Sequence, residues 1–264
     1  MKYHMKSQIP VLLPSFVIFW LAACAAPPPP SAPMPTATAT WTATAAVPTR
    51  KPTRTPLPTP TDIPGFEGWS VLNPQAVEIK SEDGGLVMTL KQRALWFMER
   101  RGVLMYKPVD GNFKITAEVY TAKSSDPSQP PGGDSTVQLG GLMARNGNSG
   151  QENYVFIVAG NDGDGLSIET KNTIESFSKY SGPVWDSAEA ELRLCRFGAT
   201  FNLYKRHVGS NEAWTPAATF DRPDLPQTLQ VGLNIYTDSA PDLQIRYDHI
   251  KIEPVSNSSD CEML

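Results

Sequence analysis

The stretch Val137–Ala159, VQLGGLMARNGNSGQENYVFIVA, places the strongest constraint on how this chain can fold. Two strand-like runs, Leu139–Arg145 and Tyr154–Ala159, flank a polar loop rich in Gly and Asn. Every position of the second run is apolar, and most are β-branched or aromatic. A short apolar run bounded by turn residues predicts a strand that is covered on both sides. We therefore predict the central hairpin of an all-β domain here.

Short strand-like runs separated by turn signals recur from Pro64 to Pro254. Alternation is clear in Asn112–Tyr120, where every second residue is apolar, and it predicts one buried and one solvated face. Leu95–Met98 is predicted as a further strand, and the break in alternation at Asp248-His249 predicts a β-bulge. Many short strands with regular turns predict two packed antiparallel sheets.

The N-terminus has the features of a targeting segment, which is set apart from the fold. Lysines precede the apolar run Val11–Ala23, which is shorter than the roughly 20 residues that span a bilayer. The run ends in Leu21-Ala22-Ala23-Cys24, which resembles the lipobox of bacterial lipoproteins. This implies a signal peptide over residues 1–23 and a lipid anchor on Cys24. The protein would then sit in the bacterial cell envelope, on the outer side of the cytoplasmic membrane or in the outer membrane. An ordinary signal peptide with a chance cysteine is the alternative.

Residues 24–63 are dominated by Pro, Thr and Ala, a composition that predicts a disordered linker. In an extended polyproline II conformation of ~3.1 Å per residue it spans ~100 Å. The β domain is predicted over residues 64–255, and residues 256–264 form a C-terminal tail. Cys195 and Cys261 remain, and in an exported protein they are predicted to form a disulfide. Two free thiols are the alternative.

Charge and motif content exclude several functions. The 264 residues carry a net charge of −4, with an isoelectric point near 5.5, which gives no basic field for nucleic acid. The histidines have no Cys or Glu at ligand spacing, so no metal centre or cofactor is expected. Asn161–Gly165 places oxygen ligands at alternate positions, as calcium loops do, but its Asp-Gly steps favour a hairpin turn, and a bound calcium ion is the alternative.

A series of short motifs carries a family resemblance. They are Gly141-Leu142-Met143-Ala144-Arg145, Tyr154-Val155, Leu192-Arg193-Leu194 with Arg196 and Gly198, Phe201-Asn202-Leu203-Tyr204, Trp214, Val231-Gly232-Leu233 and Tyr247-Asp248. In this order they resemble the concanavalin A-like lectin/glucanase superfamily, and within it the C-terminal sandwich of bacterial β-xylosidases. The resemblance covers nearly all of Gly65–Glu253. It implies a two-sheet antiparallel jelly roll whose concave sheet often binds glycans. Members include lectins, carbohydrate-binding modules, glucanases and domains without a known ligand.

Aromatic side chains on the solvated register are the candidate sugar-binding residues. The C–H faces of sugars stack on aromatic rings, while Arg and Asn bind hydroxyl groups. The candidates are Arg145, Tyr154, Arg193, Asn202, Tyr204, Trp214 and Tyr236. The alternative for each is a structural role in covering a sheet. The structural role is favoured over ligand binding if Tyr154 and Phe156 are covered by other side chains.

Catalysis is disfavoured by the carboxylate pattern. Glucanases of this fold carry carboxylates at alternate positions of one strand, and retaining chemistry needs two of them ~5–5.5 Å apart. Asp186, Glu189 and Glu191 come nearest, but Asp186 is out of phase, which favours a solvated strand entrance. We expect a monomeric, surface-anchored, non-catalytic glycan-binding lipoprotein. A glycoside hydrolase-like enzyme and a structural or protein-interaction domain of the envelope are the alternatives.

Overall fold

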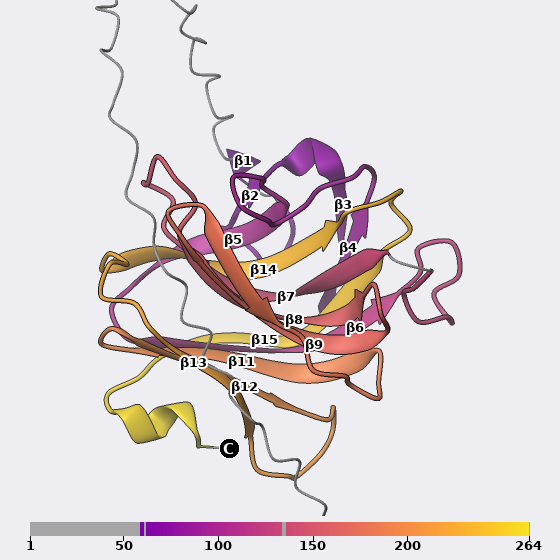
Figure 1. The fold of residues 1–264 in the computed structure, drawn as a ribbon. Coiled ribbons are helices and arrows are strands. Elements are labelled where there is room, and N and C mark those ends of the chain that lie inside the picture. Colours follow the sequence, from indigo (N-terminus) through magenta and orange to yellow (C-terminus); the bar gives the residue numbers. More distant parts are fainter. Residues whose placement is uncertain (1–58, 61, 134–135, 264) are drawn as a thin grey trace, which may run out of the picture. The chain divides into compact units, whose positions relative to one another are not determined.

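The computed structural model describes residues 59–60, 62–133 and 136–263. The predicted signal peptide, Cys24 and most of the predicted linker lie outside these residues. The described chain forms two antiparallel sheets packed face to face (Figure 1), which confirms the all-β sandwich. Within these ranges no helix has the length and apolar character needed to cross a bilayer.

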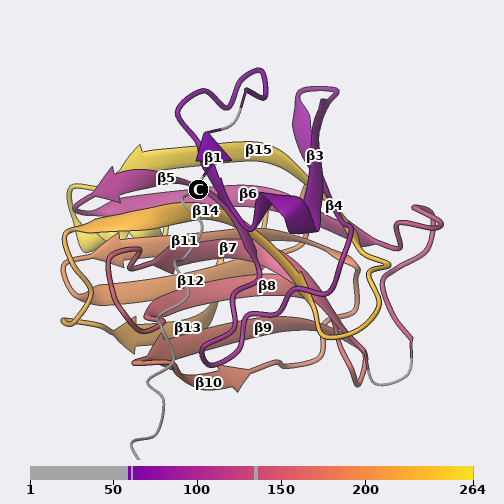
Figure 2. The same ribbon diagram turned by 90° about the horizontal axis from the view of Figure 1, so that it is seen from above.

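One sheet has eight strands in the order β1-β2-β5-β14-β7-β8-β9-β10, and Figure 2 shows most of them side by side. Their bounds are β1 (Thr59–Pro60), β2 (Ser70–Leu72), β5 (Val103–Asp110), β14 (Thr228–Thr237), β7 (Val137–Arg145), β8 (Tyr154–Asp162), β9 (Leu166–Ile174) and β10 (Phe177–Ser181). Because β1 pairs with β2, regular pairing begins inside the stretch expected to be linker.

The other sheet has seven strands in the order β13-β12-β11-β6-β15-β4-β3. Their bounds are β13 (Thr215–Asp221), β12 (Thr200–Arg206), β11 (Glu189–Phe197), β6 (Phe113–Ala122), β15 (Gln244–Pro254), β4 (Gly85–Leu90) and β3 (Val77–Glu82). Two short 3₁₀ helices, η1 (Pro74–Ala76) and η2 (Ser258–Cys261), complete the described chain.

The facing sides of the two sheets form the main core. In β6, Phe113, Ile115, Ala117 and Val119 are almost fully buried, as the alternation predicts. The predicted hairpin is the β7–β8 pair, in register from Val137–Asp162 to Arg145–Tyr154. A Cβ atom at Gly140 would collide with Ile245 of the opposite sheet, so close approach of the sheets requires glycine there.

Two local expectations have different outcomes. The β-bulge is confirmed, because the β15–β6 register shifts between Asp248 and Lys251 and His249 adopts a left-handed φ of 51°. The strand predicted at Leu95–Met98 is wrong. Lys91–Gly102, called the strap below, makes isolated bridges only. The strap crosses the outer face of the eight-stranded sheet, where it buries Ala94 and Trp96 and pairs with β14 only through the single bridge from Ala94 to Thr237.

Candidate functional site

The strap covers an aromatic layer on the outer face of the eight-stranded sheet. Trp96 is fully buried, its Nε1 donates a hydrogen bond to the Val103 carbonyl at 3.2 Å, and its ring meets Tyr154 edge-on at 5.4 Å. Phe156 and Tyr236 continue the layer towards β14. Burial raises the pKa of the Tyr154 phenol to about 12. Tyr154 and Phe156 are therefore covered by other side chains, and neither can contact a ligand in this conformation.

A buried carboxylate fastens one end of the strap. Glu152, on the β7–β8 loop, accepts two hydrogen bonds from Arg145, at 2.7 and 2.8 Å, and a third from Arg101 of the strap. Burial alone would raise the pKa of Glu152, but the hydrogen bonds and charges of the two arginines outweigh it and hold the pKa below its usual value. Arg145, a candidate ligand-binding residue, therefore holds the strap in place instead of facing solvent.

A buried lysine fastens the middle of the strap. Lys171 Nζ donates hydrogen bonds to the Trp96 carbonyl and to Glu169 Oε1, both at 3.0 Å. The Tyr236 hydroxyl donates to the same carboxylate oxygen at 2.9 Å. Burial lowers the pKa of Lys171, and the Glu169 charge offsets part of that effect. Four aromatic rings lie 4.8–5.6 Å from the Lys171 ammonium, those of Phe97, Phe156, Tyr180 and Tyr236.

A pocket of about 210 Å³, the outer-face pocket, opens beside this lysine. The strap supplies one wall and Tyr180 of β10 supplies another. Its lining residues are Leu95, Phe97, Val137, Asp162, Glu169, Lys171, Tyr180, Tyr236 and Asp238. Tyr180 is 63% exposed and meets Phe97 edge-on at 6.4 Å. The volume is below the range of about 300–1,000 Å³ that is usual for drug-sized ligands. The pocket therefore favours a ligand group no larger than one small ring.

Two carboxylates flank Val137 on the floor of the pocket. Val137 pairs with Asp162 across β7 and β8, and its N–H donates to Asp238 Oδ1 at 2.9 Å. Asp162 Oδ1 accepts from the Asp164 N–H at 3.0 Å, within the predicted β8–β9 turn. The second oxygen of each carboxylate has no hydrogen bond from the described residues. Both oxygens are therefore available to a ligand that carries donors.

Larger hollows lie elsewhere on the sandwich, among them one of about 290 Å³ whose aromatic residue, Phe113, is buried. One of about 480 Å³ is lined by Phe66, Trp69, Lys107 and His249 among others, but Trp69 is nearly buried between Phe66 and Lys107. Another of about 440 Å³ has Tyr120 as its aromatic residue, and that hydroxyl donates to Glu118 at 2.8 Å. None combines an exposed ring with two carboxylate oxygens that lack partners.

The sequence-derived candidates do not share one groove. Arg145 and Tyr154 lie under the strap, and Tyr236 reaches the outer-face pocket mainly through its hydroxyl. The remaining four lie on the outer face of the other sheet or beside it, and they are Arg193, Asn202, Tyr204 and Trp214. The expectation of a common binding surface fails because alternation identifies an outward-facing side chain but not which sheet it belongs to.

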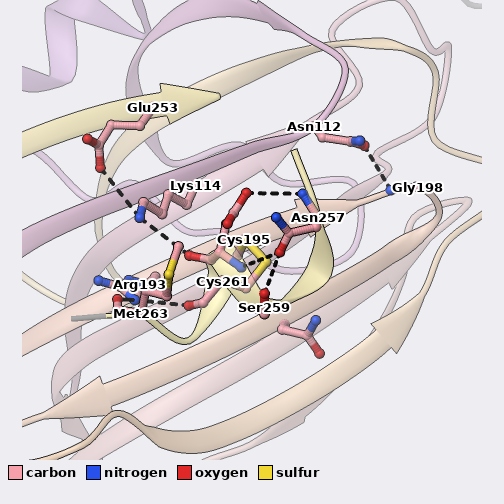
Figure 3. Close-up of a disulfide and its surroundings, with 12 residues drawn as sticks. Asn112, Lys114, Arg193, Cys195, Gly198, Glu253, Asn257, Ser259, Cys261 and Met263 are labelled. Atoms are coloured by element: carbon pink, nitrogen blue, oxygen red, sulfur yellow. Dashed lines mark hydrogen bonds and ion pairs between the residues drawn. A yellow bond between two sulfur atoms is a disulfide. The ribbon is translucent and has the colours of Figure 1, made fainter. Parts of the chain in front are cut away.

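The candidates on the seven-stranded sheet surround the C-terminal tail. The predicted Cys195–Cys261 disulfide is present and links η2 to β11, with the two Cα atoms 5.6 Å apart (Figure 3). Arg193 donates to the carbonyls of Cys261 and Met263, at 2.9 and 2.6 Å. Tyr204 and Trp214 pack with both cysteines in one small apolar cluster. The docked C-terminal tail therefore accounts for the positions of Arg193, Tyr204 and Trp214. The tail packs on the sheet and does not extend away from it.

The carboxylates considered for catalysis have different surroundings in the structure. Glu191 forms a two-bond ion pair with Arg206, at 2.6 and 2.8 Å, on the outer face of the seven-stranded sheet. Glu189 and Asp186 are exposed at the rim beside it. The guanidinium groups of Arg193 and Arg206 lie 4.0 and 4.3 Å from the Trp214 ring centroid. Glu191 therefore balances the charge of the partly buried Arg206, which lies over the same ring as the buried Arg193. Among the described residues no His, Cys, Asp or Glu cluster has the arrangement of a metal site.

The two antiparallel sheets form an all-β sandwich, and comparison with solved structures supports this fold. A functionally unknown protein from Saccharomyces cerevisiae superposes with a TM-score of 0.61 at 12% identity, over 73% of this chain and 99% of that one. The GH43 protein BlXynB from Bacillus licheniformis gives 0.54 at 11% identity, over 71% of this chain and 37% of its own. A xylan β-1,4-xylosidase from Bacillus halodurans gives 0.54 at 14% identity, over 70% of this chain and 36% of its own.

At these identities the likeness shows the fold alone. This chain matches little more than a third of the length of either Bacillus protein. No family model matches the sequence, and no curated protein matches it.

Sequence reasoning missed several residues of the pocket. Phe97 was assigned to a strand, and Asp162 was considered only as part of a turn. A signal was nevertheless available, because Asp162 continues the outward register of Tyr154 and Phe156, and Asp238 continues that of Tyr236. Extending the alternation past the last apolar residue of each strand would have placed both carboxylates on the outer face.

Proposed function

We propose that this protein is a non-catalytic glycan-binding lipoprotein of the bacterial envelope, and that the outer-face pocket holds one sugar residue. The carrying observation is an exposed Tyr180 ring beside the unpartnered oxygens of Asp162 and Asp238. A sugar presents an apolar C–H face that stacks on a ring and hydroxyl groups that donate to carboxylates. The proposal moves the predicted site from Arg145 and Tyr154 to the open side of the same sheet face.

The fold gives this proposal weaker support. Two of the similar structures are named as a GH43 protein and a xylosidase, and a shared fold carries function only by analogy. The pocket, which is built from this chain's own residues, is therefore the stronger argument.

Tyr180→Ala is expected to weaken glycan binding about three- to tenfold, because an aromatic contact of this kind contributes about 0.5–1.5 kcal/mol. Affinity electrophoresis of the full chain against a panel of polysaccharides measures the effect. Phe177→Ala is the matched control, since Phe177 is equally exposed on β10 but does not line the pocket. If no polysaccharide retards the wild-type chain, or if both variants lose binding equally, the glycan proposal is wrong.

A glycosidase function for the same pocket has weaker support than glycan binding. Asp162, Glu169 and Asp238 all line it, so carboxylates are present. Each, however, accepts a hydrogen bond or an ion pair from a fixed donor, whereas glycoside cleavage needs one protonated carboxyl as general acid. Release of reducing sugar by the wild-type chain, and its loss in Asp238→Asn, would favour the enzyme.

An interaction domain is the second candidate, because β10 is an edge strand among exposed apolar side chains. All the large apolar residues exposed in the described ranges, except Met263, gather here, and they are Met98, Ile174, Phe177, Tyr180 and Val184. Edge strands offer unpaired backbone groups to another strand. This candidate predicts antiparallel pairing of β10 with β10 of a second copy. Sedimentation equilibrium would then detect a dimer that Phe177→Lys dissociates.

The membrane anchor is tested separately. Cys24→Ala is expected to move the protein from the membrane fraction to the soluble fraction of a bacterial host, since acyl chains on Cys24 would no longer form. Fractionation with immunodetection, together with incorporation of labelled palmitate, measures this. Cys261→Ala is the control, because that thiol lies in a buried disulfide. Unchanged membrane association of the Cys24 variant would contradict the lipoprotein proposal.

A further inference from the structure

The outer-face pocket carries a net negative charge. Three carboxylates line it, Asp162, Glu169 and Asp238, against one ammonium, Lys171, which leaves a formal charge of −2. No other Lys or Arg is among its lining residues. A ligand entering the pocket therefore meets two uncompensated carboxylates.

The one lysine that lines the pocket already has bonding partners within the protein. Its ammonium lies 3.0 Å from Glu169 and 3.0 Å from the Trp96 carbonyl, and its side chain is 96% buried. The charge of Glu169 is in turn balanced by Lys171, and its Oε1 also accepts a hydrogen bond from the Tyr236 hydroxyl. These two charges cancel each other within the wall. Lys171 is thus not free to bind a carboxylate or sulfate of an incoming ligand.

The two remaining charged groups, Asp162 and Asp238, are both negative. Asp162 and Asp238 use one oxygen each to fix a backbone N–H, at 3.0 and 2.9 Å, which leaves the second oxygen of each for a ligand. Phe97 and Tyr180 also line the pocket, and their ring centroids lie 6.4 Å apart in an edge-on contact. Aromatic faces carry negative electrostatic potential and attract cations, as they already do for Lys171. The carboxylates and the rings therefore both favour a positive group.

We infer that the outer-face pocket selects a sugar residue that carries a protonated amino group, and discriminates against sugars that carry carboxylate or sulfate. The sugar part of this inference rests on the proposed glycan-binding function, whereas the ammonium preference rests on the pocket charges alone. The amino group lies between Asp162 and Asp238, and the ring stacks on Tyr180. Because both aspartates are partly exposed, each contributes as a surface ion pair does, and the combined preference over the neutral sugar is about three- to tenfold.

The test compares ligands that differ mainly in charge. Isothermal titration of the full chain at about pH 6, where primary amines are protonated, uses glucosamine trimer, N-acetylglucosamine trimer and trigalacturonate. Putrescine serves as an amine without a sugar ring. The double variant Asp162→Asn/Asp238→Asn keeps the oxygens that accept the backbone N–H groups and removes both charges. Asp164→Asn is the matched control, because Asp164 lies in the same turn but does not line the pocket.

The expected result is that glucosamine trimer binds about three- to tenfold more tightly than its N-acetylated counterpart, and that trigalacturonate binds most weakly. The preference disappears in the double variant, stays in Asp164→Asn and shrinks when sodium chloride is raised from about 0.05 to 0.5 M. Equal affinity for the amino and N-acetylated trimers, or tighter binding of trigalacturonate, would overturn the charge inference and leave the glycan proposal standing. If no sugar binds, the glycan proposal fails, and putrescine then tests the charge inference separately. Putrescine binding that is lost in the double variant supports the charge inference. Absence of putrescine binding overturns it.

Discussion

Glu152→Gln is expected to lower the free energy of unfolding by about 3–5 kcal/mol. The substitution keeps the shape of the side chain but removes the negative charge that holds Arg145 and Arg101. Both the Glu152 and Arg145 side chains are more than nine-tenths buried, so the arginine charge is left in a poorly solvated place without its partner. In a β unit of this size the loss corresponds to a fall in melting temperature of about 6–20 °C.

Chemical denaturation in urea and thermal unfolding followed by circular dichroism measure this change. Glu253→Gln is the matched control, because Glu253 is half exposed and lies 3.8 Å from Lys114, so its loss should cost less than about 1 kcal/mol. A fall below about 1 kcal/mol in Glu152→Gln itself would show that the buried ion pairs do not hold the strap on the sheet.

Replacing both cysteines, Cys195→Ala together with Cys261→Ala, is expected to cost about 4 kcal/mol. The disulfide closes a loop across a sequence separation of 66 residues, and the chain-entropy model assigns about this much stabilisation to such a loop. The two substitutions also remove buried atoms from the cluster that contains Tyr204 and Trp214. The tail then relies on the hydrogen bonds from Arg193 and the cap that Asn257 provides to η2.

Urea unfolding of the double variant measures the stability loss, and the fluorescence maximum of the native state reports whether the tail has left Trp214. A red shift is expected, since Trp214 is nearly buried when the tail is docked. Met263→Ala serves as the control, because it alters an exposed tail residue and keeps the disulfide. Stability within about 1 kcal/mol of the wild type would contradict the role given to the covalent link.

Strand positions were largely predictable because each depends on local alternation. β7 ends at Arg145 and β8 begins at Tyr154, as the two apolar runs predict, and the bulge at His249 follows from a local break in the pattern. The disulfide was predictable for a different reason, since an exported domain with two cysteines has one pairing available. Both inferences need only neighbouring residues or a simple count.

The strap was not predictable because its outcome depends on partners that are distant in sequence. Leu95–Met98 has the composition of a strand, but the outer face that it covers offers no free strand edge. Once the strap is in place, Arg145 and Tyr154 are buried although alternation puts them on the solvated register. Arg222 is a further case: it lies in a polar loop, yet it is fully buried and bonds to Asn172 and Asp224. Burial of these polar side chains is decided by the covering segments, which local sequence does not specify.

The position of β1 determines what its separation from the sandwich would disturb. β1 is a two-residue strand at one edge of the eight-stranded sheet, and β10 is at the opposite edge. Only two residue pairs join β1 to β2, so β1 can separate without breaking the pairing of β2 with β5. β2 and β5 lie between that edge and β14, the first strand of the pocket, and the disulfide lies in the other sheet. Loss of β1 from this edge would therefore leave the strands that line the outer-face pocket paired with one another.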